Sequence, residues 1–233
     1  GLIGSYTYFG ATSISVGTAR EWVAVIACGI IGGAFGAMFS AGALRLSQRI
    51  KRWAQSAPLE RNVTVAAGCG LLVAIIGVTV GGSTFGTGYE QARSAIEGDA
   101  LPYGYFVAKF AATFLSMISG IPGGIFAPAL SVGAGLGSSI GQALGVGIGL
   151  AAVLGMAGYF AGVVQAPMTA FVIILEMTDS HEGIISLMAA AMLGYLTSRM
   201  ISREPLYHGL SRAWVAEGVR IKRAVAKANG EAQ

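Results

Sequence analysis

Charged residues are scarce in this chain. Only 11% of its 233 residues are Asp, Glu, Lys or Arg, whereas 54% are hydrophobic. A soluble globular protein needs more surface charge than this to stay in solution. A mean hydropathy of +0.67 is instead typical of a membrane protein. The net charge of +4 is small, and we expect no nucleic-acid partner.

Side chains suited to catalysis or metal binding are also few. The chain has two cysteines and two histidines. Cys28 and Cys69 each lie inside an apolar run without metal-ligand spacing, so we expect both to be small core residues. No His/Ser/Asp, His-Glu-x-x-His or Cys/His constellation is present. We therefore expect neither an enzyme, nor a metal site, nor a cofactor.

Glycine, by contrast, is abundant. The 36 glycines follow no fixed period, which excludes collagen-like or solenoid repeats. Small residues let membrane helices approach closely. Two groups are predicted to form such tight contacts: Gly29, Gly32, Gly33 and Gly36, and then Ala134, Gly137, Ser138 and Gly141. The glycine-rich segment 81–88 lacks the Gly-Lys-Ser/Thr ending of a phosphate-binding loop.

The basic residues predict the orientation of the chain in a membrane. Twelve of the 15 Lys and Arg fall in two clusters, within 45–61 and 199–227. In 81–102 and 179–182, by contrast, acidic residues outnumber Lys and Arg. Basic clusters mark the cytoplasmic face. We therefore expect a cytoplasmic C-terminus and acidic outer turns.

The hydrophobic pattern predicts an all-α integral membrane protein. Thr18 and Glu21 form a capping-box pattern before the first span. Lys109 lies inside a predicted membrane helix, where we expect it to snorkel or to pair with a carboxylate. The expected membrane segments are 22–46, 62–80, 102–119, 126–143, 147–164, 168–178 and 183–200, with a short interfacial or re-entrant helix at 89–97.

One predicted break interrupts these helices at 119–128. Pro122 should end the preceding helix, and a new helix can begin near Ile125. The free backbone N–H groups near Gly124, Ile125 and Phe126 would carry the positive end of the helix dipole. Such donors at membrane depth can bind an anion. The alternative is a break that serves only helix packing.

A second break is predicted at 165–167, followed by an exit from the membrane near Pro205. Tyr207 lies directly after that exit. Its hydroxyl can point back into the bundle as an ion ligand, or the residue can belong to an interfacial aromatic belt. Residues 205–233 are predicted to form a cytoplasmic helix and tail.

These motifs together resemble the CLC chloride channels and chloride/proton antiporters. The segment Gly124-Ile125-Phe126-Ala127-Pro128 is similar to the family's G-x-F-x-P anion-binding motif. The segments 166–170 and 175–179 resemble its A-P-L-T and L-E-M-T-D stretches. Segment 81–89 is similar to its glycine-rich loop, and Tyr207 stands where the family has a pore tyrosine.

The resemblance implies a CLC-type inverted-repeat bundle with broken and re-entrant helices. It implies chloride transport by a homodimer, with protons as a second candidate ion. The anion ligands would be the backbone at Gly124, Ile125 and Phe126 and the Tyr207 hydroxyl. The helices containing Glu176 and Gly194 would line the dimer interface.

The motifs of the family's first repeat, including those that carry its pore serine and gating glutamate, are absent. We therefore expect the chain to be the later part of a longer polypeptide. Residues 1–9 would end a preceding membrane helix, 10–204 would form the second repeat, and 205–233 would contain no CBS domains. A bacterial inner-membrane protein is the simplest expectation.

Two other functions remain open. A cation-coupled solute transporter would place clusters of intramembrane Asp, Asn or Ser near the helix breaks, and the breaks contain no acid. A non-transporting membrane scaffold subunit would have uninterrupted spans. Neither pattern is present at 120–128 or 165–167.

Overall fold

The computed structural model describes residues 16–121, 123–178, 183–202, 204–212 and 215. These residues contain helices and no strands. The labelled helices are α1 (Ala19–Ala54), α2 (Pro58–Thr79), α3 (Tyr89–Glu97), α4 (Tyr103–Ile118), α5 (Phe126–Leu144), α6 (Ile148–Val164), α7 (Pro167–Thr178) and α8 (Ile184–Ile201). A further helical segment covers residues 206–212. The predicted all-α fold is confirmed.

Helix α6 forms the centre of the bundle. All of its residues from 149 to 163 are buried, and it packs against α1, α5 and α8. Its glycines allow these contacts. A Cβ atom on Gly158 would lie 2.3 Å from the carbonyl oxygen of Cys28 in α1, and one on Gly137 would lie 2.0 Å from that of Ala151. The predicted glycine-mediated packing is therefore confirmed.

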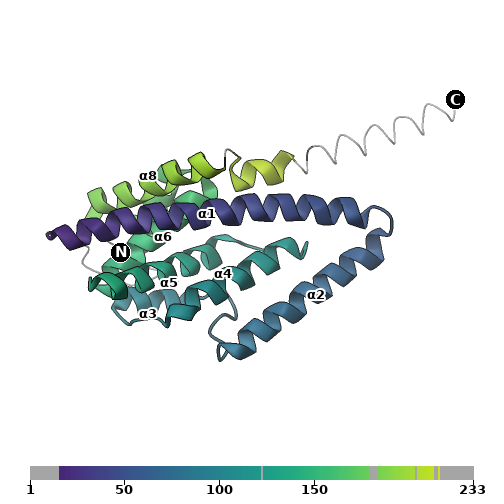
Figure 1. The fold of residues 1–233 in the computed structure, drawn as a ribbon, viewed down its shortest axis with the longest axis horizontal. Coiled ribbons are helices and arrows are strands. Elements are labelled where there is room, and N and C mark those ends of the chain that lie inside the picture. The colour runs from purple at the N-terminus through teal and green to yellow at the C-terminus, as the bar shows by residue number, and fades with distance from the viewer. Residues whose placement is uncertain (1–15, 122, 179–182, 203, 213–214, 216–233) are drawn as a thin grey trace, which may run out of the picture.

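Helices α1 and α8 lie side by side and run in the same direction (Figure 1). A Cβ atom on Gly33 of α1 would lie 2.4 Å from the carbonyl oxygen of Gly194 in α8. Gly194, on a helix expected at a dimer interface by resemblance, is thus itself buried within the chain. The basic last turns of both helices consequently lie toward the same end of the molecule (Figure 1).

Helix α1 is longer than predicted. It begins with the expected capping box, because the Thr18 hydroxyl oxygen accepts from the Glu21 amide and the Glu21 carboxylate accepts from the Thr18 amide. Its predicted end near Leu46 was wrong, since the helix continues to Ala54. The basic residues there are good helix formers, and no Gly or Pro interrupts them before Pro58. At 1.5 Å per residue the helix is about 54 Å long, more than a hydrocarbon core requires.

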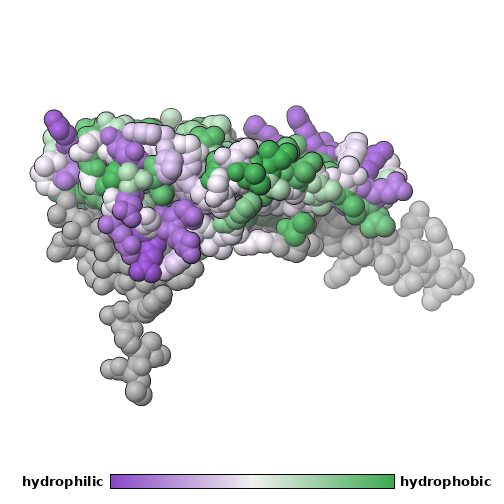
Figure 2. Space-filling model, turned by 90° about the horizontal axis from the view of Figure 1, so that it is seen from below, coloured by the Kyte–Doolittle hydropathy of each residue, from purple (hydrophilic) through white to green (hydrophobic). Residues whose placement is uncertain are grey.

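Helix α2 is the least enclosed of the long helices. It diverges from the bundle in Figure 1, and only 11% of its most apolar stretch of 18 residues is buried. Among the described residues, α1, α2 and α8 are long and apolar enough to cross a membrane. The surface seen in Figure 2 has an apolar area between hydrophilic areas at its two sides. This distribution suits a protein surrounded by lipid.

Candidate anion-binding site

The first break separates α4 from α5. Gly120 adopts a left-handed backbone conformation with φ of 80°, and Ile125 precedes the first residue of α5. No side chain caps this N-terminus. The first hydrogen bond of the helix is donated by the Ala129 amide to the Ile125 carbonyl, at 2.9 Å. The amides of Ile125, Phe126 and Ala127 precede it and have no acceptor inside the helix.

The backbone around Gly124 is uncovered. A Cβ atom built on Gly123 or Gly124 would meet nothing within 4 Å. No charged side chain lies between Ser119 and Pro128, so within this segment the field comes from peptide dipoles. This end of α5 can therefore accept a negatively charged ligand without a fixed positive side chain.

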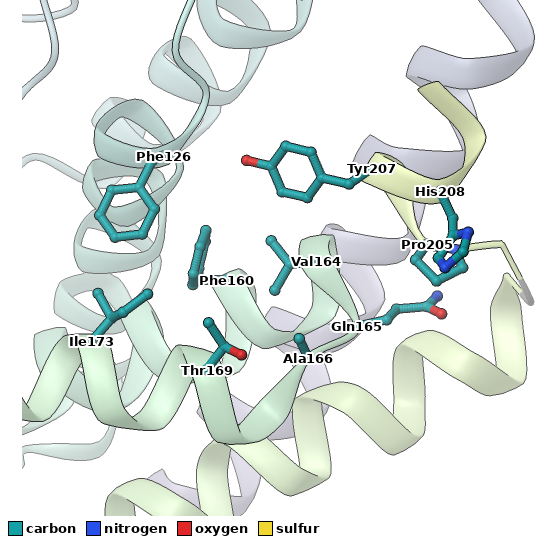
Figure 3. Close-up of a pocket in the computed structure, with 10 residues that line it drawn as sticks. All are labelled: Phe126, Phe160, Val164, Gln165, Ala166, Thr169, Ile173, Pro205, Tyr207 and His208. Carbon is teal, nitrogen blue, oxygen red and sulfur yellow. The ribbon is translucent and has the colours of Figure 1, made fainter. Parts of the chain in front are cut away.

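A cavity of about 420 Å³ lies next to the start of α5. Phe126 and Tyr207 both line it, so the fold brings together two site residues that are 81 positions apart in the sequence. Gly124 and Ile125 precede Phe126 and are not part of the lining. Among the residues that the structure describes, none of those lining the cavity is acidic; they are Phe126, Phe160, Val164, Gln165, Ala166, Thr169, Ile173, Pro205, Tyr207 and His208 (Figure 3).

Tyr207 projects into this cavity. Its hydroxyl points across the space toward Phe126 and Phe160 (Figure 3). The side chain is about half exposed, at 51%. Partial burial raises the pKa of the phenol above its ordinary value, so the hydroxyl remains protonated at neutral pH. It can therefore act as a hydrogen-bond donor toward an anion.

The second break opens onto the same cavity. Helix α6 ends at Gln165, and α7 begins at Pro167, with the Ala170 amide bonded to the Ala166 carbonyl at 3.0 Å. The predicted break is confirmed. Ala166 and Thr169 place the start of α7 in the cavity wall. Two helix N-termini therefore border one space.

Phe160 and Gln165 are cavity residues that the sequence analysis did not identify. The Phe160 ring packs edge-on against Phe126, with ring centroids 4.9 Å apart. No sequence signal distinguishes Phe160 from the rest of an apolar helix. Gln165 could have been noticed as a lone polar residue between an apolar helix and a proline.

Lys109 lies apart from the cavity. It is 1% exposed, and its ammonium Nζ donates to the carbonyl oxygens of Thr84 and Gly86 at 2.9 Å each. The expectation that it snorkels or pairs with a carboxylate was wrong, because the left-handed glycine loop turns backbone carbonyls toward it. Glycine suits position 88 beside this lysine, because its φ is 79° and a Cβ atom there would lie 2.2 Å from Ser131 Oγ and 2.9 Å from Lys109 Cε.

Cys28 and Cys69 are both buried and free, as predicted. No group of three or more His, Cys, Asp and Glu residues that could hold a metal ion occurs among the residues that the structure describes. Glu176, on α7, is exposed, whereas Asp179 lies outside the described residues.

The fold and the cavity together define a class of protein: an integral membrane protein whose broken helices direct their N-termini to one shared, partly open cavity. The sequence profile of the voltage gated chloride channel family matches residues 1–199. The chain belongs to this family, and the resemblance to CLC proteins is confirmed.

Curated relatives support the same assignment. The chain is 31% identical over 196 residues to the H(+)/Cl(-) exchange transporter ClcA of Salmonella agona (strain SL483). That match covers 80% of this chain and 41% of the relative. The ClcA of Yersinia pestis bv. Antiqua (strain Angola) is also 31% identical, over 78% of this chain and 40% of the relative. The chain thus spans about two fifths of these relatives.

Solved structures share the fold. A slow cyanobacterial Cl-/H+ antiporter superposes with a TM-score of 0.70 at 21% identity, over 89% of this chain and 50% of that chain. A CLC-type fluoride/proton antiporter superposes with a TM-score of 0.69 at 22% identity, over 83% and 49%. The architecture of this chain is therefore that of about half of a CLC subunit.

Proposed function

We propose that this chain supplies one half of a transmembrane chloride pathway, with the anion held between the N-terminus of α5 and the hydroxyl of Tyr207. The observation that supports this proposal is that Phe126 and Tyr207 line the same cavity, with no acidic side chain among the described residues of its wall. The lack of an acidic residue in the described part of this wall also disfavours the cation-coupled alternative, because a cation needs compensating negative charge as well as oxygen ligands.

The proposed binding is favourable but not tight. Backbone N–H groups and a phenol attract an anion without the full charge of Lys or Arg. A transport site must bind the ion strongly enough to admit it and weakly enough to release it. The Ile125 and Phe126 amides, next to the uncovered Gly124, suit that requirement.

The whole protein would contain a preceding half that completes the pathway. We infer this from the coverage of about two fifths of the curated relatives. By analogy with them, we propose a homodimer in a bacterial inner membrane, with a cytoplasmic C-terminus, without a cofactor and without enzymatic activity. Protons are proposed as the exchanged ion, because the ClcA relatives are named as H(+)/Cl(-) exchangers.

Flux measurements on the full-length protein in liposomes test this function. We expect chloride efflux, with external pH recorded at the same time. Proton movement driven uphill by the chloride gradient would identify an exchanger, and efflux without it would identify a channel. Absence of efflux from folded, dimeric protein would contradict the transport function and favour the scaffold alternative. Residues 1–233 alone should conduct nothing in the same assay.

A further inference from the structure

Gln165 occupies an unusual backbone position for its residue type. Its φ of 53° and ψ of 35° place it in the left-handed region, and it is the only non-glycine residue with positive φ in the described part of the chain. Glycine or asparagine is the usual residue at such a helix end. A glutamine there suggests that its side chain has a role beyond ending α6.

The Gln165 side chain ties the end of α6 to the end of α8. Its Nε2 donates to the Ser198 hydroxyl at 3.2 Å and to the Ser202 carbonyl at 2.7 Å. The Ser198 hydroxyl itself donates to the Gly162 carbonyl at 2.6 Å. A hydroxyl has one proton, so Ser198 must accept from Gln165, which fixes the orientation of the amide. We name Gln165, Ser198 and Ser202 the glutamine bridge.

The bridge lies next to the segment that carries Tyr207. Ser202 caps α8 with an extended backbone, at φ of −134° and ψ of 123°. Pro205 and Tyr207 follow it and line the cavity, as does Gln165. In Figure 3 the Gln165 side chain points away from the cavity, whereas Tyr207 points into it. Gln165 therefore contacts the wall behind the cavity and leaves the space itself free.

The opposite wall is held by a different contact. Phe126 at the start of α5 packs against Phe160 of α6, and Gln165 ends that same helix. Helix α6 is buried from 149 to 163 and carries both contacts, with Phe160 near its end and Gln165 directly after it. The Phe126–Phe160 contact on one side and the glutamine bridge on the other therefore both contribute to the distance from Tyr207 to the start of α5, together with the full burial of Leu206 beside Tyr207.

We propose that Gln165 is a positioning residue that sets the gap between the Tyr207 hydroxyl and the N-terminus of α5, and thereby the affinity and size selectivity for the anion. This inference rests on the proposed function and adds a determinant of selectivity to it. Gln165 touches neither the anion nor the α5 amides, and it acts through Tyr207.

The test replaces Gln165 in the full-length protein. Gln165→Met keeps the side-chain length and removes both donors. We expect chloride affinity to fall about 2- to 10-fold, the loss associated with about one net hydrogen bond, and the bromide-to-chloride flux ratio to rise. Unchanged affinity and unchanged flux ratio would overturn the proposal.

Gln165→Gly separates positioning from helix ending. Glycine suits the left-handed backbone, so thermal stability in detergent should equal or exceed that of Gln165→Met. If the bridge positions Tyr207, Gln165→Gly changes affinity and flux ratio as Gln165→Met does. Wild-type transport by Gln165→Gly would instead show that Gln165 only ends α6.

A double-mutant cycle shows whether the effect passes through Tyr207. In a Tyr207→Phe background, Gln165→Met should add no further loss of chloride affinity, whereas independent effects would add. Additive losses would overturn the positioning role. If wild-type protein itself neither binds nor moves chloride, the proposed function fails. If Tyr207→Phe changes chloride binding and Gln165→Met does not, only the bridge fails.

Discussion

The break between α4 and α5 and the break between α6 and α7 border the same cavity but are held differently. The first contains Gly120 with positive φ and exposes Gly123 and Gly124. The second contains one left-handed residue, Gln165, whose side chain is bonded to α8. The α4–α5 break therefore offers backbone N–H donors to a ligand. The α6–α7 break, hydrogen-bonded to α8, fixes the position of the cavity wall opposite those donors.

Supporting contacts differ in the same way. Helix α6, which leads into the second break, is buried along 149–163. Ser119 at the first break is bonded only locally, with its hydroxyl donating to the Ser116 carbonyl at 2.7 Å and accepting from the Ile121 amide at 3.3 Å. Substitutions at the first break should therefore change anion binding, and substitutions around the second should first change stability or geometry.

The largest change in binding is expected from Phe126→Pro, which removes a backbone donor at the start of α5. One hydrogen bond to a charged group contributes about 1.5–3 kcal/mol, so chloride affinity should fall roughly 10- to 100-fold by calorimetry. Phe126→Leu is the matched control, because it loses the ring contact with Phe160 and keeps the N–H. Equal affinities for the two variants would contradict the backbone site.

A comparable effect, but on stability, is expected from Gly158→Ala. The new Cβ atom would lie 2.3 Å from the Cys28 carbonyl oxygen, and neither backbone can yield without separating α1 from α6. Overpacking of this kind costs about 1–3 kcal/mol, measurable as a lower unfolding temperature in detergent. Gly70→Ala in α2, where nothing lies within 4 Å, serves as the control. Equal stability of both variants would contradict the packing.

Within the first break, Gly120→Ala and Gly124→Ala should differ. Gly120 has φ of 80°, so alanine there should lower the free energy of unfolding by about 1 kcal/mol. Gly124 has open space around it, so alanine should leave stability within about 0.5 kcal/mol of wild type and reduce chloride affinity by covering the amides. A stability loss at Gly124 with unchanged affinity would show that this position serves folding alone.

The smallest effect is expected from Tyr207→Phe, which removes only the hydroxyl from a half-exposed side chain. Water can replace part of that bond, so chloride affinity should fall about 2- to 10-fold, with little change in unfolding temperature. A change in thermal stability alone would support the interfacial-belt interpretation of Tyr207.

Local signals in the sequence were sufficient to predict most helix boundaries. Pro and Gly stand at the breaks, and Thr18 and Glu21 form the predicted cap. The end of α1 was placed too early, because charged residues were treated as the end of the helix rather than as its extension beyond the apolar core. Residues 1–15, including the expected end of a preceding helix, lie outside the described residues.

The candidate site was predicted in part. Proline and glycine around Phe126 carry a local signal, and Tyr207 has one in its place after the last span. The contacts of Lys109 with loop carbonyls and of Gln165 with α8 join residues 23–37 positions apart. Such contacts depend on how the helices pack, which no local pattern in one sequence specifies.

The central claim is that an anion binds between the start of α5 and Tyr207. The most direct measurement is anomalous X-ray diffraction from crystals of the full-length protein grown in bromide, which replaces chloride and can be located by its scattering. The account predicts a bromide peak in the cavity, adjacent to the Phe126 amide and the Tyr207 hydroxyl. Bromide peaks found only elsewhere in the protein, with this cavity empty, would contradict it.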